Sequence, residues 1–454
     1  MLNLTPKQIA DRKALRINPC KTCQPVGALY CALGVHKCMP HSHGSQGCVS
    51  YHRTFLSRHF KEPAIASTSS FTEGASVFGG GSNLRTAAKN VFEIYDPDII
   101  AVHTTCLSET IGDDVGSYIA DMDIPADKLV VHTNTPSYVG SHVTGFFNMM
   151  CGFINYLARH TGRNNGKVAI FPGFLNPGDL REMKRIADMM QTSYIMFPDQ
   201  SGVMDAPMTG RYEMYPSGGT TIDEIAALGD CDKVLALGKL TSLEPANVLK
   251  RKCKVPYELM PLPIGIEGTD KYVMELSALA QTEVPAAIEE ERGQLIDVML
   301  DAHFYYHGKT VAVFGDPDTV LGLTQLVLEM GMIPKYVITG TPGEAFERMT
   351  GEIFRKFDVT DCVAKANADL FELHQWIKNE PVDLLIGSSY GKQIAKAENI
   401  PFVRAGFPVL DRYAHSYFPI TGYRGALRLV EQITNALLDQ RDRECADEDA
   451  DVVM

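Results

Sequence analysis

The sequence lacks several features that would assign a protein of this size to a common class. Lys and Arg total 42 against 55 Asp and Glu, so the formal net charge is −13. The absence of excess positive charge argues against a nucleic-acid-binding protein. No run of about 18 apolar residues occurs, so we expect no membrane-spanning helix. The N-terminus has no basic segment followed by an apolar stretch, so we expect no secretory signal and predict a cytoplasmic protein.

Complete nucleotide-binding motifs are also missing. The stretch 307–310 ends like a P-loop, but His303 stands where that motif requires Gly. The stretch 387–392 has the wrong spacing, and the glycines at 79–81 follow no clear strand. We therefore predict no ATP site in this chain and assign any ATP-driven step to a partner.

The length and the hydrophobic pattern indicate the fold class. At roughly 150 residues per domain, 454 residues suggest about three domains. Short apolar runs alternate with amphipathic stretches, which predicts an α/β protein of three Rossmann-like, doubly wound domains with mostly parallel sheets. The expected domains are 1–165, 166–305 and 306–454. The expected strands are 98–103, 167–172, 233–238, 310–315, 382–387 and 401–404, and the expected helices are 108–121, 178–191 and a segment from 318 to about 330.

The two ends of the chain differ from this pattern. The first 90 residues are rich in Cys, His, Gly and Ser and contain few regular apolar runs. We expect this segment to pack around a site rather than to build a core. The tail 441–454 is acidic, and we expect it to be solvated.

Eleven cysteines are the most unusual feature of the composition. An odd number at irregular spacing is a poor disulfide framework, and in a reducing compartment functional thiols bind metal or perform redox chemistry. Cys23, Cys48 and Cys106 lie in turn-like settings. Cys106 comes between a predicted strand and a predicted helix, and Cys48 opens a helix expected over 49–60. A helix N-terminus favours the thiolate, which is the form that binds iron.

The alternative is that these thiols are buried and structural, which suits Cys151, Cys231, Cys253 and Cys362. Cys20 and Cys23 form a CxxC, but no second CxxC completes a zinc site, and no bacterial ferredoxin run is present. If Cys23, Cys48 and Cys106 share a cluster, three thiolates are too few to complete it, and another chain supplies the rest. The residues alone leave both interpretations open.

Several segments, taken in chain order, carry a family resemblance. They are Asn18–Gly27, Pro40–Cys48, Arg58–Pro63, Thr104–Glu109, Ile111–Asp114, Asn134–Gly145, Gly315–Asp318, Ser389–Lys392, Gly406–Pro408 and Asp411–Arg412. Together they resemble the β chains of nitrogenase molybdenum–iron proteins over nearly the whole length. The resemblance is strongest to the compact form, which has no long extension before the first cysteine.

This resemblance implies an electron-relay subunit. It implies an α2β2 heterotetramer with nitrogenase α chains and a transient complex with the ATP-hydrolysing iron protein, without nucleic acid or membrane partners. It further implies an [8Fe-7S] P-cluster shared with the α chain, which holds the iron–molybdenum cofactor and reduces dinitrogen to ammonia. No catalytic residue is therefore expected in this chain.

The resemblance also implies roles for single residues. Cys23, Cys48 and Cys106 match P-cluster ligands, and Ser137 matches a serine that ligates iron in the oxidised cluster. Tyr51 matches an aromatic residue near the electron path. Cys20, Cys31 and Cys38 match no ligand, so the CxxC is interpreted as incidental.

A second metal site is implied between two β chains, at Glu62, Asp297 and Asp301. Asp297 and Asp301 are four residues apart, so on a helix both carboxylates project from one face. Oxygen ligands favour Ca²⁺ or Fe(II). The alternative is a solvated acidic face beside Arg292 or Lys309.

Three other functions use a similar fold. They are a non-catalytic scaffold for cofactor assembly, a dark-operative protochlorophyllide reductase, and the β chain of a vanadium or iron-only nitrogenase. The three cysteines together with Ser137 favour a nitrogenase β chain, and the stretches 40–44 and 105–108 favour the molybdenum type.

Overall fold

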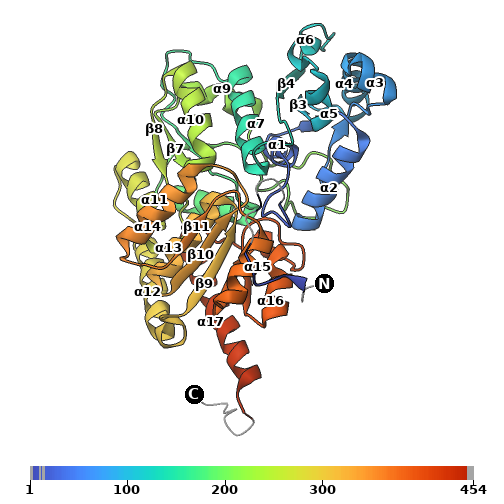
Figure 1. Cartoon of the computed structure of the whole chain (residues 1–454). Coiled ribbons are helices and arrows are strands. Elements are labelled where there is room, and N and C mark those ends of the chain that lie inside the picture. Colours follow the sequence, from blue (N-terminus) through green and yellow to red (C-terminus); the bar gives the residue numbers. More distant parts are fainter. Residues whose placement is uncertain (1–3, 10–11, 13–15, 447–454) are drawn as a thin grey trace. The chain divides into compact units, whose positions relative to one another are not determined.

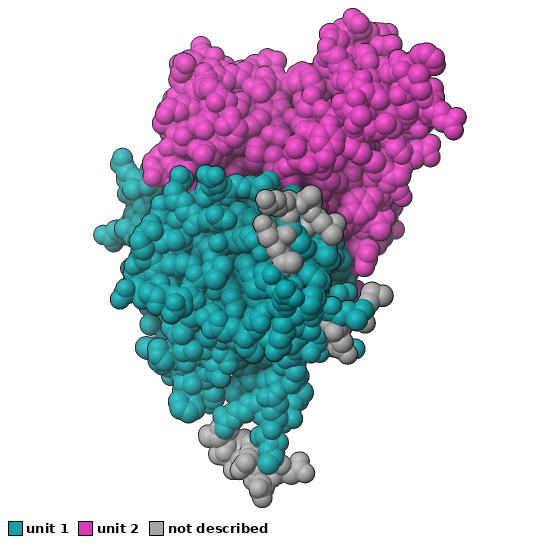
Figure 2. Space-filling model, viewed as in Figure 1, with its two compact units in different colours: residues 1–21, 261–412, 418–454 teal, residues 22–260, 413–417 magenta. Residues whose placement is uncertain are grey.

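The computed structural model describes residues 4–9, 12 and 16–446 (Figure 1). The chain divides into two compact units, which Figure 2 shows in different colours. Unit 2 comprises Thr22–Met260 and Tyr413–Tyr417, and unit 1 comprises Met1–Lys21, Pro261–Arg412 and Phe418–Met454. The described residues form three sheets, and every pair of neighbouring strands in them is parallel. The predicted α/β class with parallel sheets is confirmed.

The first sheet of unit 2 has the strand order β2-β1-β3-β4. Its strands are β1 (Cys38–His43), β2 (Ser67–Thr68), β3 (Ile99–Thr104) and β4 (Leu129–Thr133). The apolar face, with Met39, Ile100 and Val102, packs against α4 and α6. The helices of this region are α1 (Gln24–Leu33), α2 (Gln46–Phe60), α3 (Glu73–Phe78), α4 (Gly81–Tyr95), α5 (Cys106–Ile111), α6 (Val115–Ala120) and α7 (His142–Leu157).

The second sheet of unit 2 has the order β6-β5-β7-β8. Its strands are β5 (Val168–Phe171), β6 (Tyr194–Met196), β7 (Lys233–Leu237) and β8 (Tyr257–Met260). The accompanying helices are α8 (Pro177–Met189), α9 (Ile222–Ala227), η2 (Leu228–Asp230), α10 (Lys239–Cys253) and η4 (His415–Tyr417).

Unit 1 contains a five-stranded sheet in the order β11-β10-β9-β12-β13. β9 lies at the centre, β10 and then β11 follow on one side of it, and β12 and then β13 follow on the other side. This is the arrangement of a Rossmann-like sheet. Its strands are β9 (Thr310–Gly315), β10 (Ile333–Thr339), β11 (Val363–Lys365), β12 (Leu384–Gly387) and β13 (Phe402–Arg404). The helices are α11 (Gly265–Ala280), α12 (Ala286–Tyr306), α13 (Pro317–Glu329), α14 (Glu344–Lys356), α15 (Leu370–Asn379), η3 (Ser389–Gly391), α16 (Lys392–Glu398) and α17 (Gly422–Glu444).

The six predicted strands all occur, at β3, β5, β7, β9, β12 and β13. The predicted division at residues 165 and 305 stays a prediction. Among the described residues, no helix is both long enough and apolar enough to span a membrane.

Two local predictions are wrong. The segment 108–121 is two short helices, α5 and α6, because Gly112 takes a positive φ of 76° that ends the first. The first 90 residues also contain a fully buried strand, β1, in the interior of a sheet. It was missed because its Pro-His-Ser-His sequence is polar. The described part of the predicted solvated tail, 441–446, is largely exposed, although it includes the end of α17 at Glu444, and 447–454 lie outside the described residues.

Candidate metal centre

Each of the three predicted cysteine ligands lies at the N-terminus of a helix. Cys23 is the N-cap of α1, Cys48 is the third residue of α2, and Cys106 is the first residue of α5. Pro25 follows in the first turn of α1, where its fixed φ favours helix initiation. Cys23 and Cys48 are half-buried, and Cys106 is exposed. The sequence predicted this setting for Cys48 and Cys106 but not for Cys23.

The topology of the first sheet brings two of these cysteines together. The chain order reverses between β1 and β3, which are neighbours in the sheet. Cys48 follows the carboxyl end of β1, and Cys106 follows that of β3 directly. Parallel sheets place binding sites outside the carboxyl ends of their strands at such a switch point. Cys48 is close enough to both Cys23 and Cys106 for the three thiols to influence one another electrostatically.

Side-chain hydrogen bonds connect the segments that carry the cysteines. Gln24, next to Cys23, donates from Nε2 to the carbonyl oxygens of Pro136 and Val139, each at 3.1 Å. These two carbonyls flank Ser137, so the Ser137 turn is joined to the start of α1. Thr135 donates from its hydroxyl to the Thr104 carbonyl at 2.6 Å. The same turn is thereby joined to the end of β3, two residues before Cys106.

The loops after β1 and β3 are joined in the same way. The hydroxyl of Ser108 donates to the carbonyl oxygen of His43 at 2.8 Å, and that of Thr105 donates to the same oxygen at 3.2 Å. Thr105 and Ser108 also form the capping box that starts α5. The position of Cys106 relative to the end of β1 therefore depends on hydroxyl groups adjacent to it.

Two glycines allow α1 and α7 to approach closely. A Cβ atom at Gly27 would overlap the backbone of His142, and one at Gly145 would overlap the backbone of Gln24. The His142 backbone N–H also donates to the Thr22 carbonyl at 3.0 Å. Because any larger side chain would separate the helices, these glycines set the position of the Cys23 end of α1.

Burial sets the protonation of two of the candidate thiols. Burial raises the pKa of the Cys23 thiol to about 11. Burial, and next the neighbouring Cys106, raise the pKa of Cys48. These effects outweigh the helix N-termini, so the thiols of Cys23 and Cys48 stay protonated in the absence of a positive partner. Iron would reverse this balance, because a coordinating metal displaces the thiol proton.

Ser137 and Tyr51 also belong to this region of unit 2. Ser137 is half-buried in the turn after β4. Tyr51 lies in α2, is 49% exposed, and its hydroxyl is 3.1 Å from that of Thr22, the residue before Cys23. Among the described residues, no three His, Cys, Asp or Glu side chains converge closely enough to hold a single metal ion.

Comparison with known proteins decides the family. Residues 23–438 match the family described as nitrogenase component 1 type oxidoreductase. A nitrogenase molybdenum–iron protein beta chain of Clostridium pasteurianum is 60% identical over 100% of both chains. The corresponding beta chain of Frankia alni is 41% identical over 95% of this chain and 84% of its own. The chain belongs to the nitrogenase component 1 type oxidoreductases.

Solved structures agree with this assignment. The structure titled "Nitrogenase Cp1 at pH 6.5" matches this component 1 chain with a TM-score of 0.99 at 60% identity, covering 100% of both chains. A second chain, titled "Nitrogenase Cp1 at pH 5", shares the fold at a TM-score of 0.70 and 16% identity, covering 98% of this chain and 94% of its own. The resemblance inferred from the cysteine segments is confirmed.

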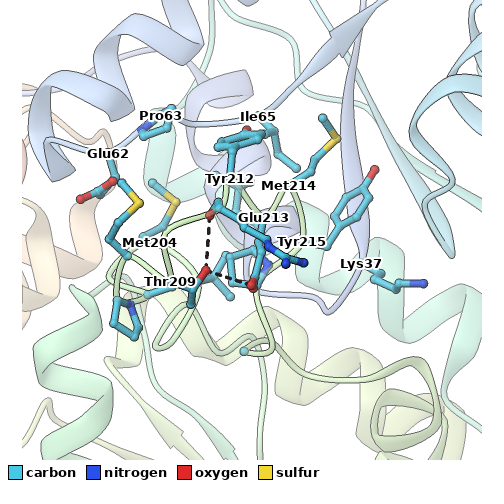
Figure 3. A pocket seen from close by; sticks show the side chains of 18 of the residues that line it. Lys37, Glu62, Pro63, Ile65, Met204, Thr209, Tyr212, Glu213, Met214 and Tyr215 are labelled. Carbon is cyan, nitrogen blue, oxygen red and sulfur yellow. Dashed lines mark hydrogen bonds between the residues drawn. The ribbon is translucent and has the colours of Figure 1, made fainter.

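Glu62, a predicted cation ligand, follows the end of α2. Its side chain lines a cavity of about 370 Å³ in unit 2 (Figure 3). The other walls come largely from 203–216, with Met204, Tyr212 and Met214. Thr209 donates to the Glu213 carboxylate at 3.0 Å across this loop. The cavity is mostly apolar, and the predicted cation role of Glu62 stays a prediction.

Asp297 and Asp301 lie on α12 in unit 1, and both are exposed. The predicted helix under them is confirmed. The alternative basic neighbours are engaged elsewhere, because Arg292 pairs with Asp270 at 2.9 Å and Lys309 with Asp383 at 3.2 Å. Within the described part of the chain, neither Asp297 nor Asp301 has an ion pair.

The remaining cysteines of the N-terminal segment differ from the three candidates. Cys20 is 5% exposed and packs in the core of unit 1 with Phe314 and Ile338. Burial raises its pKa. Cys31 and Cys38 are buried within α1 and β1.

Two residues that matter to the candidate centre were missed from the sequence. Gln24 holds the Ser137 turn, and His52 places its Nε2 atom 3.7 Å from the Cys23 sulfur. His52 lies four residues after Cys48, which places both side chains on one face of α2. This spacing could have indicated that His52 lies near the candidate ligands.

Proposed function

We propose that this chain is the electron-relay β subunit of a nitrogenase molybdenum–iron protein, and that Cys23, Cys48 and Cys106 bind a P-cluster shared with an α chain. The observation that carries the proposal is the proximity of three thiols, each at a helix N-terminus, two of which follow the strands at the switch point of the first sheet. Identity of 60% over the full length to a molybdenum–iron protein beta chain supports this function over a cofactor-assembly scaffold, a protochlorophyllide reductase or another nitrogenase type.

The residues fit such a group. Thiolates are the usual ligands of iron–sulfur clusters, and a polynuclear cluster needs ligands spaced around it rather than converging on one atom. Three thiols fall short of a full ligand set, and the exposure of Cys106 leaves its side accessible to a second chain. When bound, an [8Fe-7S] cluster would supply one-electron transfer between the ATP-hydrolysing iron protein and the α chain's iron–molybdenum cofactor.

The other residues of this chain position and adjust the ligands. Gln24 and Thr135 hold the turn from which Ser137 offers a hydroxyl oxygen, a hard ligand suited to a more oxidised iron. Gly27 and Gly145 allow α1 to pack closely against α7, which helps to position Cys23. Tyr51, beside Thr22, presents an aromatic ring near the ligands.

The resemblance supports an α2β2 assembly with α chains, and cofactor content tests the sharing of cluster ligands between the two chain types. We expect the copurified αβ complex to contain an eight-iron cluster by iron analysis and EPR, and the chain produced alone to contain none. A full [8Fe-7S] signal in the isolated chain would contradict ligand sharing.

The ligand assignment is tested by substitution within the complex. We expect Cys48→Ala to remove or remodel the cluster, because alanine cannot bind iron. Cys20→Ala and Cys38→Ala are matched controls in the same segment, and we expect both to retain the full iron content. If Cys20→Ala lost as much iron as Cys48→Ala, the CxxC would belong to the site and the assignment would be wrong.

A further inference from the structure

A row of buried polar side chains leads through the first sheet to Cys23. His103 on β3 and Ser42 on β1 are direct neighbours in the sheet register, and His103 Nε2 is 2.7 Å from Ser42 Oγ. Ser42 Oγ is in turn 3.4 Å from Nδ1 of His52 on α2. The other nitrogen of His52, Nε2, is 3.7 Å from the Cys23 sulfur. Three elements that are distant in sequence thus form one continuous connection.

The connection is sealed from water. His103 and Ser42 are 0% exposed, and His52 is 2% exposed. The hydrogen-bond partners of the two imidazoles are Ser42 and Cys23, and no carboxylate among the described residues pairs with either ring, so each buried ring is neutral and carries one N–H donor and one acceptor nitrogen. The direction of every hydrogen bond therefore depends on which nitrogen of each ring carries the proton.

An unpartnered atom at the far end decides that direction. Nδ1 of His103 is buried and has no hydrogen-bond partner among the residues that the structure describes. A proton there would be a buried, unsatisfied N–H, which native proteins almost always avoid. The proton of His103 therefore lies on Nε2 and is donated to Ser42 Oγ.

The remaining protons follow in sequence. Because Ser42 accepts from His103, its single O–H is available to donate to Nδ1 of His52. Nδ1 of His52 is then an acceptor, and the His52 proton lies on Nε2, the atom that faces Cys23. The three donors point the same way, and such a chain polarises each successive bond.

We propose that His52 donates a hydrogen bond from Nε2 to the Cys23 sulfur and thereby raises the reduction potential of the bound cluster. The inference rests on the proposed function. A hydrogen bond donated to a ligating sulfur stabilises negative charge on the cluster. Because the reduced cluster carries more negative charge than the oxidised one, the donor stabilises the reduced form and raises the reduction potential. His52 is a positioning residue that acts through Cys23, and with its proton on Nε2 it has no lone pair there to bind iron.

The groups next to Cys23 in the chain are engaged elsewhere. The backbone N–H of Val26 donates to the Cys23 carbonyl oxygen at 3.2 Å, and the Thr22 hydroxyl lies 3.1 Å from that of Tyr51. His52 adds a donor from a different helix, whose direction is set by β1 and β3. Removal of this single donor should shift the potential without removing the ligand.

The test compares two substitutions in the copurified αβ complex. His52→Phe keeps a ring but has no N–H, and His52→Gln keeps an amide N–H at a similar reach. We expect His52→Phe to retain full iron content and to raise the oxidised-to-reduced ratio at a fixed potential by up to about tenfold, which corresponds to a midpoint lower by about 59 mV for one electron. We expect His52→Gln to restore most of the wild-type midpoint, measured by EPR-monitored redox titration.

Two further variants isolate the connection. Ser42→Ala removes the hydroxyl that orients His52, so we expect a smaller shift in the same direction. His41→Gln is a matched control, because His41 is a buried histidine of the same strand whose side chain points to the opposite face of the sheet. We expect its midpoint to equal that of the wild type.

Each contrary outcome has a separate meaning. An unchanged midpoint in His52→Phe with full iron would overturn the proposal, as would equal iron loss in His52→Phe and His52→Gln, which would make His52 a ligand. If His52→Phe failed to fold, an unchanged midpoint in Ser42→Ala would still overturn it. Absence of any eight-iron signal in the wild-type complex would instead contradict the proposed function.

Discussion

The first sheet of unit 2 and the sheet of unit 1 are both parallel and have buried inner strands, but these strands are built from different side chains. In the unit 1 sheet, the central strands β9 and β12 present Val311, Val313 and Leu385, all 0% exposed, to an apolar core. In the first sheet, β1 presents His41, Ser42 and His43 with the same degree of burial. Equal burial is therefore reached by packing along β9 and β12 and by hydrogen bonding along the second half of β1.

This difference follows from the cost of burying polar groups. His41 hydrogen-bonds to Ser67 and Ser69 at 2.8 Å, and His43 hydrogen-bonds to Ser69 at 2.8 Å and to Asp113 at 2.9 Å. Burying a histidine side chain costs free energy because its nitrogens lose their hydrogen bonds to water, and each of these partners offsets that cost by replacing a lost bond. An apolar strand incurs no such cost. The buried polar residues of β1 thus lie near the candidate site at the carboxyl end of the strand, while the apolar strands β9 and β12 form a packed core.

The largest expected effect tests the packing of the scaffold. Leu385→Ala removes a fully buried side chain from the unit 1 core, which should destabilise that unit by about 2–5 kcal/mol. Hydrogen exchange of β9 and β12 in the αβ complex measures this loss. Val363→Ala, at a 40% exposed position of the edge strand β11, is the control and should change protection by less than about 0.5 kcal/mol. Equal losses in the two variants would contradict the assigned core.

The second prediction concerns pH. Burial lowers the pKa of His41 to about 3 in the folded chain, against about 6.5 when unfolded. Between these values the unfolded state binds more protons, so the first sheet should lose stability as pH falls below about 6.5. The loss attributable to His41 should reach about 2 kcal/mol at pH 5.

Hydrogen exchange between pH 7 and pH 5, corrected for the intrinsic exchange rate, checks this prediction in β1 and β3. The strands β9 and β12 serve as an internal control, since they contain no histidine. His41→Gln should reduce the pH dependence of the first sheet. Equal acid sensitivity in both sheets would remove the distinction between them.

A smaller effect is expected at Ser137, in the turn attached to the first sheet. Ser137→Ala should leave the reduced cluster assembled but alter the EPR spectrum and the midpoint potential of the oxidised one, because a hard oxygen ligand favours oxidised iron. Ser137→Thr keeps the hydroxyl and is the matched control. Unchanged oxidised spectra in Ser137→Ala would remove this residue from the ligand set.

The smallest effect is expected on the exposed face of α12 in unit 1. If Asp297 and Asp301 join Glu62 of a second copy at a divalent cation, Asp301→Asn should weaken the β–β contact several-fold without altering cluster EPR. Analytical ultracentrifugation, with and without a chelator that spares the clusters, measures this contact. Crystals grown with a heavier divalent ion should show an anomalous peak between the carboxylates. A Lys or Arg filling that space would contradict the site.

Prediction from the sequence succeeded where local patterns repeat. Apolar runs such as 310–315 and 382–387 located strands within two residues, because a buried parallel strand needs a continuous apolar segment. It failed at β1, where polar residues are buried through contacts with 67–69 and 113, and at Gly112, whose positive φ splits a predicted helix.

The sequence by itself determined the fold class, the family and the identity of the three candidate thiols, because motif order and hydrophobic periodicity are properties of the chain alone. Only the tertiary structure decided that Cys23 caps α1, that Gln24 holds the Ser137 turn, and that His52 faces Cys23. The physical reason is that the last two relations join residues from 29 to 115 positions apart. Their geometry depends on the switch point between β1 and β3 and on close packing of α1 against α7, which no local pattern encodes.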